Sequence, residues 1–165
     1  MPGYAIHLAM AEEYIKKHKD IKNRDDFFKG VLYPDSVKDK SLTHYGPNSA
    51  SSDLTKFLKD HTSMDDYTKG HFIHLVSDYL FYKELDELLS EKIYDDYDIL
   101  NNEIIKKYNV KIPKEIESII HYKEGKLTYL SQELVDKIIE NVSSKSIDEY
   151  IEEIKENPQK WLEFK

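Results

Sequence analysis

The chain contains no cysteine. Disulfide bonds and thiolate metal sites are therefore excluded, and a transition-metal centre would have to use imidazole, carboxylate and water ligands. The sequence supplies 7 histidines and 32 aspartate and glutamate residues for such a centre. The informative patterns are therefore those that combine histidine with acidic residues.

Long apolar runs and a basic surface are also lacking. No stretch approaches the roughly 18 to 20 apolar residues of a membrane-spanning helix, and the N-terminal segment becomes charged too early for a secretory signal. We therefore expect no transmembrane segment and a cytoplasmic location. The formal net charge of −8 opposes binding to DNA or to an acidic membrane surface. A broad nucleic-acid-binding surface is not expected.

The pattern of apolar residues is helical. The length of 165 residues suits one domain, and the two candidate strands, 109–112 and 126–130, are too short to indicate a sheet. The sequence predicts an all-α fold, a compact multi-helix bundle in a single domain over residues 1–165. Helices are expected over 4–19, from Asp53 through Leu58, and over 64–90, 93–108, 113–121, 130–142 and 146–156.

The segment from Asp20 to Ser52 differs from the rest of the chain. A short helix can begin near residue 25, but glycine, proline and serine residues then interrupt regular structure. We therefore predict a long irregular connection between the first helix and the central helices. Long connections inside compact domains often carry functional groups, and this one contains Asp35 and His44.

The central motif is GHFIHLVSDYLFYKEL, residues 70–85, on the strongest helical pattern in the chain. It places His71, His74 and Asp78 near one face, and the i, i+4 spacing brings His74 and Asp78 to about 5–6 Å at Cβ. Burial among apolar neighbours makes an unpaired polar group costly, so each needs a partner. Two interpretations are open: metal ligation, or a hydrogen-bonded pair inside a helical core.

Three other polar residues stand in apolar or turn-forming surroundings. They are His7 on the first helix, Asp35 in a Tyr-Pro-Asp sequence, and His44 in Thr-His-Tyr-Gly-Pro. Together with His74 and Asp78 they form a set of imidazole and carboxylate groups that can meet at one metal site, built mainly from residues 4–85.

The order of these motifs resembles the ligand order of the zinc-dependent phospholipase C family, whose relatives include nucleases. The resemblance covers roughly residues 4–85. It implies an all-helical fold and hydrolysis of phosphodiesters by a metal-activated water. It also implies that Asp35 is catalytic, bridging ions or orienting the attacking water, and that the metal ligands are His7, Asp35, His44, His74 and Asp78.

Further ligands or supporting residues are expected near this set. His71 can be a ligand, a partner of a ligand, or a buried histidine satisfied elsewhere. Asp96 and Asp98 can supply carboxylates if the helix over 93–108 packs on the helix carrying His74. Acidic residues at a helix start are otherwise usually solvated and favoured by the helix dipole.

Two functions are compatible with these patterns. The first is a metal-dependent hydrolase of a small-molecule or phospholipid-like phosphoester, with Zn²⁺ as the expected ion and Mn²⁺ or iron as alternatives. The second is a non-enzymatic helical protein that uses a structural metal or a buried polar network and offers its acidic surface to a protein partner. An open coordination position would favour the enzyme.

Overall fold

The residues described by the computed structural model, 3–85 and 93–163, contain helices and connecting segments but no strand. The predicted all-α class is therefore confirmed. The helices are α1 (Tyr4–Lys17), α2 (Arg24–Ser36), α3 (Ser41–His44), α4 (Leu54–Asp60), α5 (Asp66–Glu84), α6 (Ile93–Lys107), α7 (Lys114–Glu117), α8 (Gln132–Ser144), α9 (Ile147–Glu156) and the 3₁₀ turn η1 (Lys160–Leu162).

Several helices begin at residues whose side chains cap the first turn. The carboxylates of Asp53 and Asp65 accept backbone N–H groups of α4 and α5. Ser146 and Glu149 form a reciprocal capping box at the start of α9. These interactions satisfy N–H groups that have no partner within the helix.

The short helix that the sequence allowed near residue 25 is α2, but it extends over residues 24–36, so the predicted irregular connection from Asp20 to Ser52 is wrong for the later part of this range. Its N-cap Asn23 accepts the N–H of Asp26, and Pro34 lies in the last turn, where the helix is about to end. Gly30 permits contact with α5 rather than breaking α2, since a Cβ there would lie 1.9 Å from the carbonyl oxygen of Tyr67. Asp35 is therefore held on a helix, and the irregular parts of this segment are residues 20–23 before α2 and the residues around α3.

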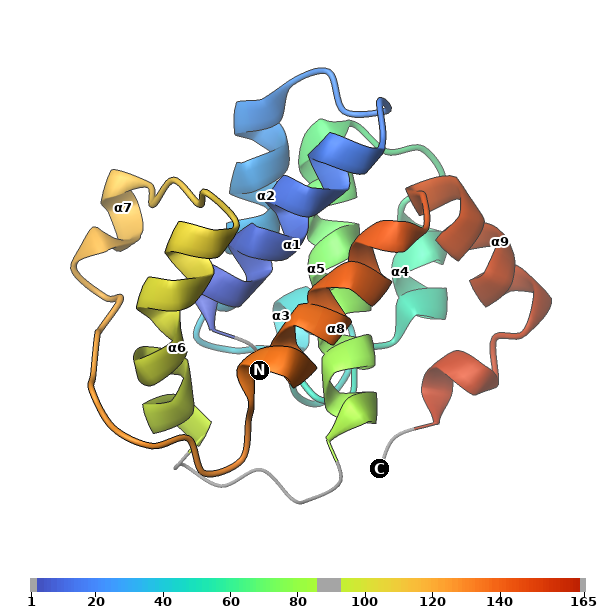
Figure 1. Ribbon diagram of the computed structural model, residues 1–165. Coiled ribbons are helices and arrows are strands. Elements are labelled where there is room, and N and C mark those ends of the chain that lie inside the picture. Colours follow the sequence, from blue (N-terminus) through green and yellow to red (C-terminus); the bar gives the residue numbers. More distant parts are fainter. Residues whose placement is uncertain (1–2, 86–92, 164–165) are drawn as a thin grey trace.

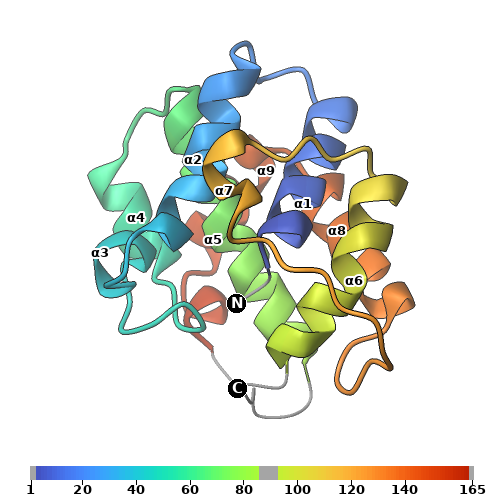
Figure 2. The ribbon, with the colours of Figure 1, turned by 90° about the vertical axis from the view of Figure 1, so that its left-hand side faces the viewer.

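Helix α5 runs through the middle of the molecule (Figure 1). Helix α2 packs closely along it, and α1 contacts α2, α5, α6 and α8. Figure 2 shows the short α3 close to the end of α2 and beside α4. One buried apolar cluster joins α1, α6 and α8, and a second joins α4, α5 and α9. The N-terminal half of α1 therefore lies deep in the bundle.

Two other helix predictions need adjustment. Helix α7 covers only Lys114–Glu117 of the predicted 113–121. Helix α5 ends at Glu84, and the remainder of the predicted 64–90 helix after Leu85 falls outside the described residues. No helix in the described ranges has the length and apolar character needed to cross a membrane.

Candidate metal centre

The five predicted metal ligands meet in the interior of the bundle. Helix α1 contributes His7, α2 contributes Asp35, α3 contributes His44, and α5 contributes His74 and Asp78. Their side chains are at most 2% exposed. We call this group the His/Asp cluster.

Each carboxylate in the His/Asp cluster faces all three imidazoles. Oxygen atoms of Asp78 lie 3.0 Å from Nε2 of His44, 3.2 Å from Nε2 of His7 and 3.3 Å from Nε2 of His74. The corresponding distances from Asp35 are 3.8, 3.7 and 3.5 Å. The three Nε2 atoms thus converge on two carboxylates.

The outer nitrogens of His7 and His74 are held by the surrounding helices. The Nδ1–H of His74 donates to the carbonyl oxygen of Val31 at 2.7 Å. The Ser77 hydroxyl donates to the carbonyl oxygen of His74 at 2.7 Å, so at its 2.9 Å contact with His7 it accepts from Nδ1–H. Both rings, when neutral, therefore carry the proton on Nδ1 and present the Nε2 lone pair to the cluster.

His44 is oriented in the same way. The Thr43 hydroxyl donates to the carbonyl oxygen of Pro34 at 3.0 Å. Its contact of 3.0 Å with Nδ1 of His44 is then a bond in which the ring donates. With all three rings neutral, three nitrogen lone pairs face two ionised carboxylates, and only a cation between them makes this arrangement favourable.

A metal ion fits the donors present. In the described residues, Nε2 of His7 and His74 and Oδ1 of Asp35 and Asp78 are buried and have no hydrogen-bond partner. Two ligands on one tetrahedral zinc ion lie about 3.3–3.5 Å apart, and the nitrogen–oxygen distances here run from 3.0 to 3.8 Å. One divalent ion would also balance the charge of the two carboxylates.

Two ligand triads can be drawn within the His/Asp cluster. His7, Asp35 and His74 form one, and His44, His74 and Asp78 form the other, with ligand atoms in each triad within 4.8 Å of one another. The triads share His74. Since its Nε2 has a single lone pair, it can serve only one ion at a time.

A proton is the alternative cation. Burial acts to lower the pKa of His74, but the carboxylates of Asp35 and Asp78 outweigh it and raise that pKa to about 10. Burial and the charge of His74 lower the pKa of His7. Burial acts to raise the pKa of Asp78, but His74 and hydrogen bonds from the imidazoles hold it well below its usual range. Without a metal, the cluster is thus a His74 imidazolium between two carboxylates.

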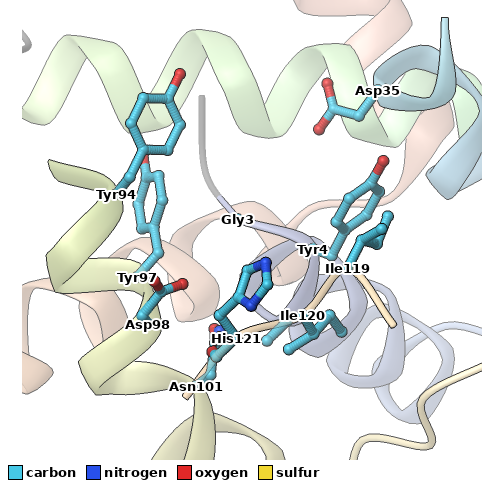
Figure 3. Close-up of a pocket in the computed structure, with 11 residues that line it drawn as sticks. Gly3, Tyr4, Asp35, Tyr94, Tyr97, Asp98, Asn101, Ile119, Ile120 and His121 are labelled. Atoms are coloured by element: carbon cyan, nitrogen blue, oxygen red, sulfur yellow. Dashed lines mark hydrogen bonds between the residues drawn. The ribbon is translucent and has the colours of Figure 1, made fainter. Parts of the chain in front are cut away.

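A pocket of about 250 Å³ reaches Asp35 from the surface. Figure 3 shows Tyr94 and Tyr97 entering it from α6, His121 lying opposite, and the hydroxyl of Tyr4 directed toward Asp35. The carboxylate of Asp35 therefore lies between the buried imidazoles and this pocket, so the His/Asp cluster has a route to solvent.

The additional predicted residues lie outside the His/Asp cluster. Nε2 of His71 contacts the carbonyl oxygen of Thr43 at 2.7 Å, beside His44, and burial lowers the pKa of His71 to about 4. Asp98 lines the pocket. Asp96 instead accepts the backbone N–H groups of residues 128, 129 and 130 at 2.7–2.8 Å.

Four residues that support the site were not singled out from the sequence. Ser77 and Thr43 orient imidazoles, and Tyr97 lines the pocket. Nζ of Lys40 donates to the carbonyl oxygens of Asp35 and Val37 at the end of α2. Two of them had a local sequence signal: Ser77 lies between His74 and Asp78 on the same helix, and Thr43 directly precedes His44.

Comparison of the chain with protein-family models, with curated proteins and with solved structures finds no match. The structure itself defines the class: a helical protein with a buried His/Asp cluster that could hold a metal ion.

Proposed function

We propose that the protein is a metal-dependent hydrolase of phosphoester bonds. One observation carries the proposal: Nε2 of His7 and of His74 and one oxygen each of Asp35 and Asp78 face one another, buried and without a hydrogen-bond partner in the described residues, and Asp35 also borders an open pocket. Such an arrangement suits a bound cation that is accessible to a substrate.

The residues have distinct parts in this proposal. His7, His44, His74 and Asp78 hold the ion, and the outer hydrogen bonds from Nδ1 keep the rings in place. A zinc ion bound there would lower the pKa of a water molecule to near neutrality and stabilise negative charge on phosphoryl oxygens. Asp35 is a ligand that also faces the pocket, where it orients the attacking water and accepts its proton.

Zinc is proposed because three imidazoles and two carboxylates match its preferred nitrogen and oxygen donors. Mn²⁺ and iron accept the same ligand types and are the alternatives. The ligand order along the chain, with its resemblance to zinc-dependent phospholipases C, also supports zinc.

The proposed substrate is a small-molecule or phospholipid-like phosphoester. The apolar side chains of Ile119 and Ile120 line the pocket, and Ile119 is 48% exposed. Large apolar side chains at a pocket mouth favour a substrate with an apolar portion next to the phosphoryl group.

A non-enzymatic role is the second candidate. The near-complete burial of all five side chains favours a structural metal or a closed polar network. Against it stands the pocket at Asp35, because a closed structural site has no need of a route to solvent.

The decisive experiment measures metal content by inductively coupled plasma mass spectrometry on untagged protein. Wild type is compared with His74→Ala and Asp78→Ala. His61→Ala serves as the control, because His61 contacts Tyr45 and lies outside the cluster. Circular dichroism establishes that each variant is folded. The proposal expects near-stoichiometric metal in wild type and in His61→Ala, and little in the other two.

Activity is then tested with bis(p-nitrophenyl) phosphate and p-nitrophenyl phosphate. Asp35→Asn should abolish hydrolysis while the protein stays folded. A wild type that binds no zinc, manganese or iron removes the hydrolase proposal. Stoichiometric metal without hydrolysis of any phosphoester favours the structural role.

A further inference from the structure

Tyr97 has a buried hydroxyl without a use in the fold. The residue is 4% exposed, and among the described residues its hydroxyl has no hydrogen-bond partner. Buried hydroxyls in native proteins almost always have a partner, because losing contact with water without compensation costs stability. Ser52 and Thr55 also have buried hydroxyls without a partner in the described residues, but of the three only Tyr97 lines the pocket that reaches Asp35.

The ring of Tyr97 is fixed by contacts on several sides. A Cβ added to Gly3 at the start of α1 would lie 3.3 Å from its Cγ, so the ring packs tightly against this backbone position. The ring of Phe81, less than one turn beyond Asp78 on α5, lies 6.2 Å away, and that of Tyr94 lies 5.9 Å away. The hydroxyl is therefore held in one place.

The surroundings of the hydroxyl make it a donor. Burial, followed by the charge of Asp78, raises the pKa of Tyr97 well above its ordinary value, and Asp35 adds to this effect. The phenol is thus protonated at neutral pH and lies within the electrostatic influence of both carboxylates. Neither carboxylate accepts its hydrogen bond, so an acceptor has to come from the pocket.

We infer that the Tyr97 hydroxyl is a substrate-binding group that donates a hydrogen bond to a phosphoryl oxygen held at the His/Asp cluster. The inference rests on the proposed function. No lysine or arginine lines the pocket in the described part of the chain, so the Tyr97 hydroxyl is a fixed donor where a fixed cationic side chain of that kind is lacking. A fixed donor aimed at a position where negative charge gathers is an effective way to bind an oxyanion.

Tyr94 offers a matched control. It lies one helical turn before Tyr97, borders the same pocket and is 53% exposed. Y94F removes a tyrosine hydroxyl that borders the pocket but belongs to an exposed side chain. It therefore measures the effect of losing a phenol hydroxyl that is not buried. The pair Y97F and Y94F therefore separates a fixed donor from a general effect of tyrosine.

The experiment uses zinc-loaded full-length protein and inorganic phosphate as the probe. Zinc content, the midpoint of thermal unfolding without phosphate, and the phosphate dissociation constant from isothermal titration calorimetry are measured for wild type, Y97F and Y94F. In Y97F we expect unchanged zinc content, an unfolding midpoint equal to or above that of wild type, and a phosphate dissociation constant raised about tenfold. Y94F should resemble wild type in all three.

Each result has a clear meaning. If Y97F binds zinc and binds phosphate as tightly as wild type, the inference about Tyr97 is wrong while the metal proposal stands. If Y97F unfolds or is markedly less stable, the hydroxyl is structural and the inference is also wrong. If wild type holds no metal, the proposed function and this inference fall together.

Discussion

His7 on α1 and His74 on α5 stack their imidazole rings with centroids 3.8 Å apart and planes 12° apart. Two stacked rings cannot both be protonated without strong repulsion, and His74 contributes to the lowered pKa of His7. Burial and, after it, the charge of His74 lower the pKa of His7 and favour its neutral form, whose Nε2 faces Asp78. A neutral imidazole in a fixed orientation is suited to bind a metal ion.

Substitution of His7 tests this relationship. In His7→Phe a flat ring remains on His74 but offers no lone pair. We expect zinc affinity to fall at least tenfold, since even the partners of metal ligands are usually worth that much. Competition with a chromogenic chelator measures the affinity, and chemical unfolding measures stability without metal. Unchanged affinity in the folded variant would exclude His7 as a ligand.

Ser77 should affect the metal without touching it. Its hydroxyl accepts from Nδ1 of His7 and donates to the carbonyl oxygen of His74. Ser77→Ala frees the His7 ring to rotate and should weaken zinc binding about 10- to 100-fold. Ser144→Ala is the control, because within the described residues that hydroxyl donates to the carbonyl oxygen of Asn141 and lies outside the cluster. Equal zinc affinity in the two variants would show that His7 needs no orientation from Ser77.

Zinc binding should release about one proton between pH 6.5 and 9. In the metal-free protein the pKa of His74 is raised to about 10, so its Nε2 is protonated over this range and must lose that proton to bind a metal. Zinc affinity should therefore increase about tenfold for each unit of rising pH. Calorimetry in two buffers of different ionisation enthalpy counts the protons.

The raised pKa of His74 also determines whether the stability of the metal-free protein rises or falls with pH. Because the folded-state pKa of His74 is raised, its contribution to stability is fully present below about pH 6.5 and is lost as pH rises through about 10. Urea unfolding of chelator-treated protein should show that wild type has a larger free energy of unfolding than His74→Gln. This difference in free energy should shrink with rising pH. Zinc binding without proton release would mean that His74 is neutral in the metal-free protein.

The helices could be predicted because their apolar spacing and caps are local. Asp53 and Ser146 mark the starts of α4 and α9 in the sequence, and they cap those helices in the structure. The sequence allowed only a short helix near residue 25, and the extension of α2 to Ser36 was missed because Gly30 and Pro34 are typical helix breakers. What makes Gly30 compatible with a helix is its contact with the backbone of Tyr67 on α5, and such a long-range contact leaves no local pattern.

The site, too, could be predicted only in part from local sequence patterns. Residue type and motif order predicted which five side chains meet, and the structure brings them together. Asp96 shows the limit: an acidic run at a helix start has the same local pattern whether it binds a metal, solvent or a backbone segment more than 30 residues away. Tyr97 was one of 13 tyrosines, and only its unpartnered burial distinguishes it.

The contact between α2 and α5 should tolerate no side chain at Gly70. A Cβ there would lie 2.1 Å from the carbonyl oxygen of Phe27. Although alanine normally stabilises a helix relative to glycine by about 1 kcal/mol, Gly70→Ala should destabilise the protein by about 1–3 kcal/mol through overpacking. Urea unfolding is the measurement.

Because the variant separates α2 from α5, it should also move Asp35 away from His74 and weaken zinc binding. Lys29→Ala, on the exposed side of α2, should change neither property. A stabilised Gly70→Ala variant would show that the two helices do not approach as closely as the structure has them.

Asp96 should be essential to stability and irrelevant to metal. Its carboxylate accepts three backbone N–H groups from residues 128–130, which lead into α8. Asp96→Ala leaves these donors without a partner and should cost about 2–3 kcal/mol of unfolding free energy. Asp95→Ala removes only an exposed ion pair with Lys123 and should cost less than about 1 kcal/mol. Both variants should retain wild-type zinc content, and a folded Asp96→Ala protein that loses zinc would make Asp96 a ligand after all.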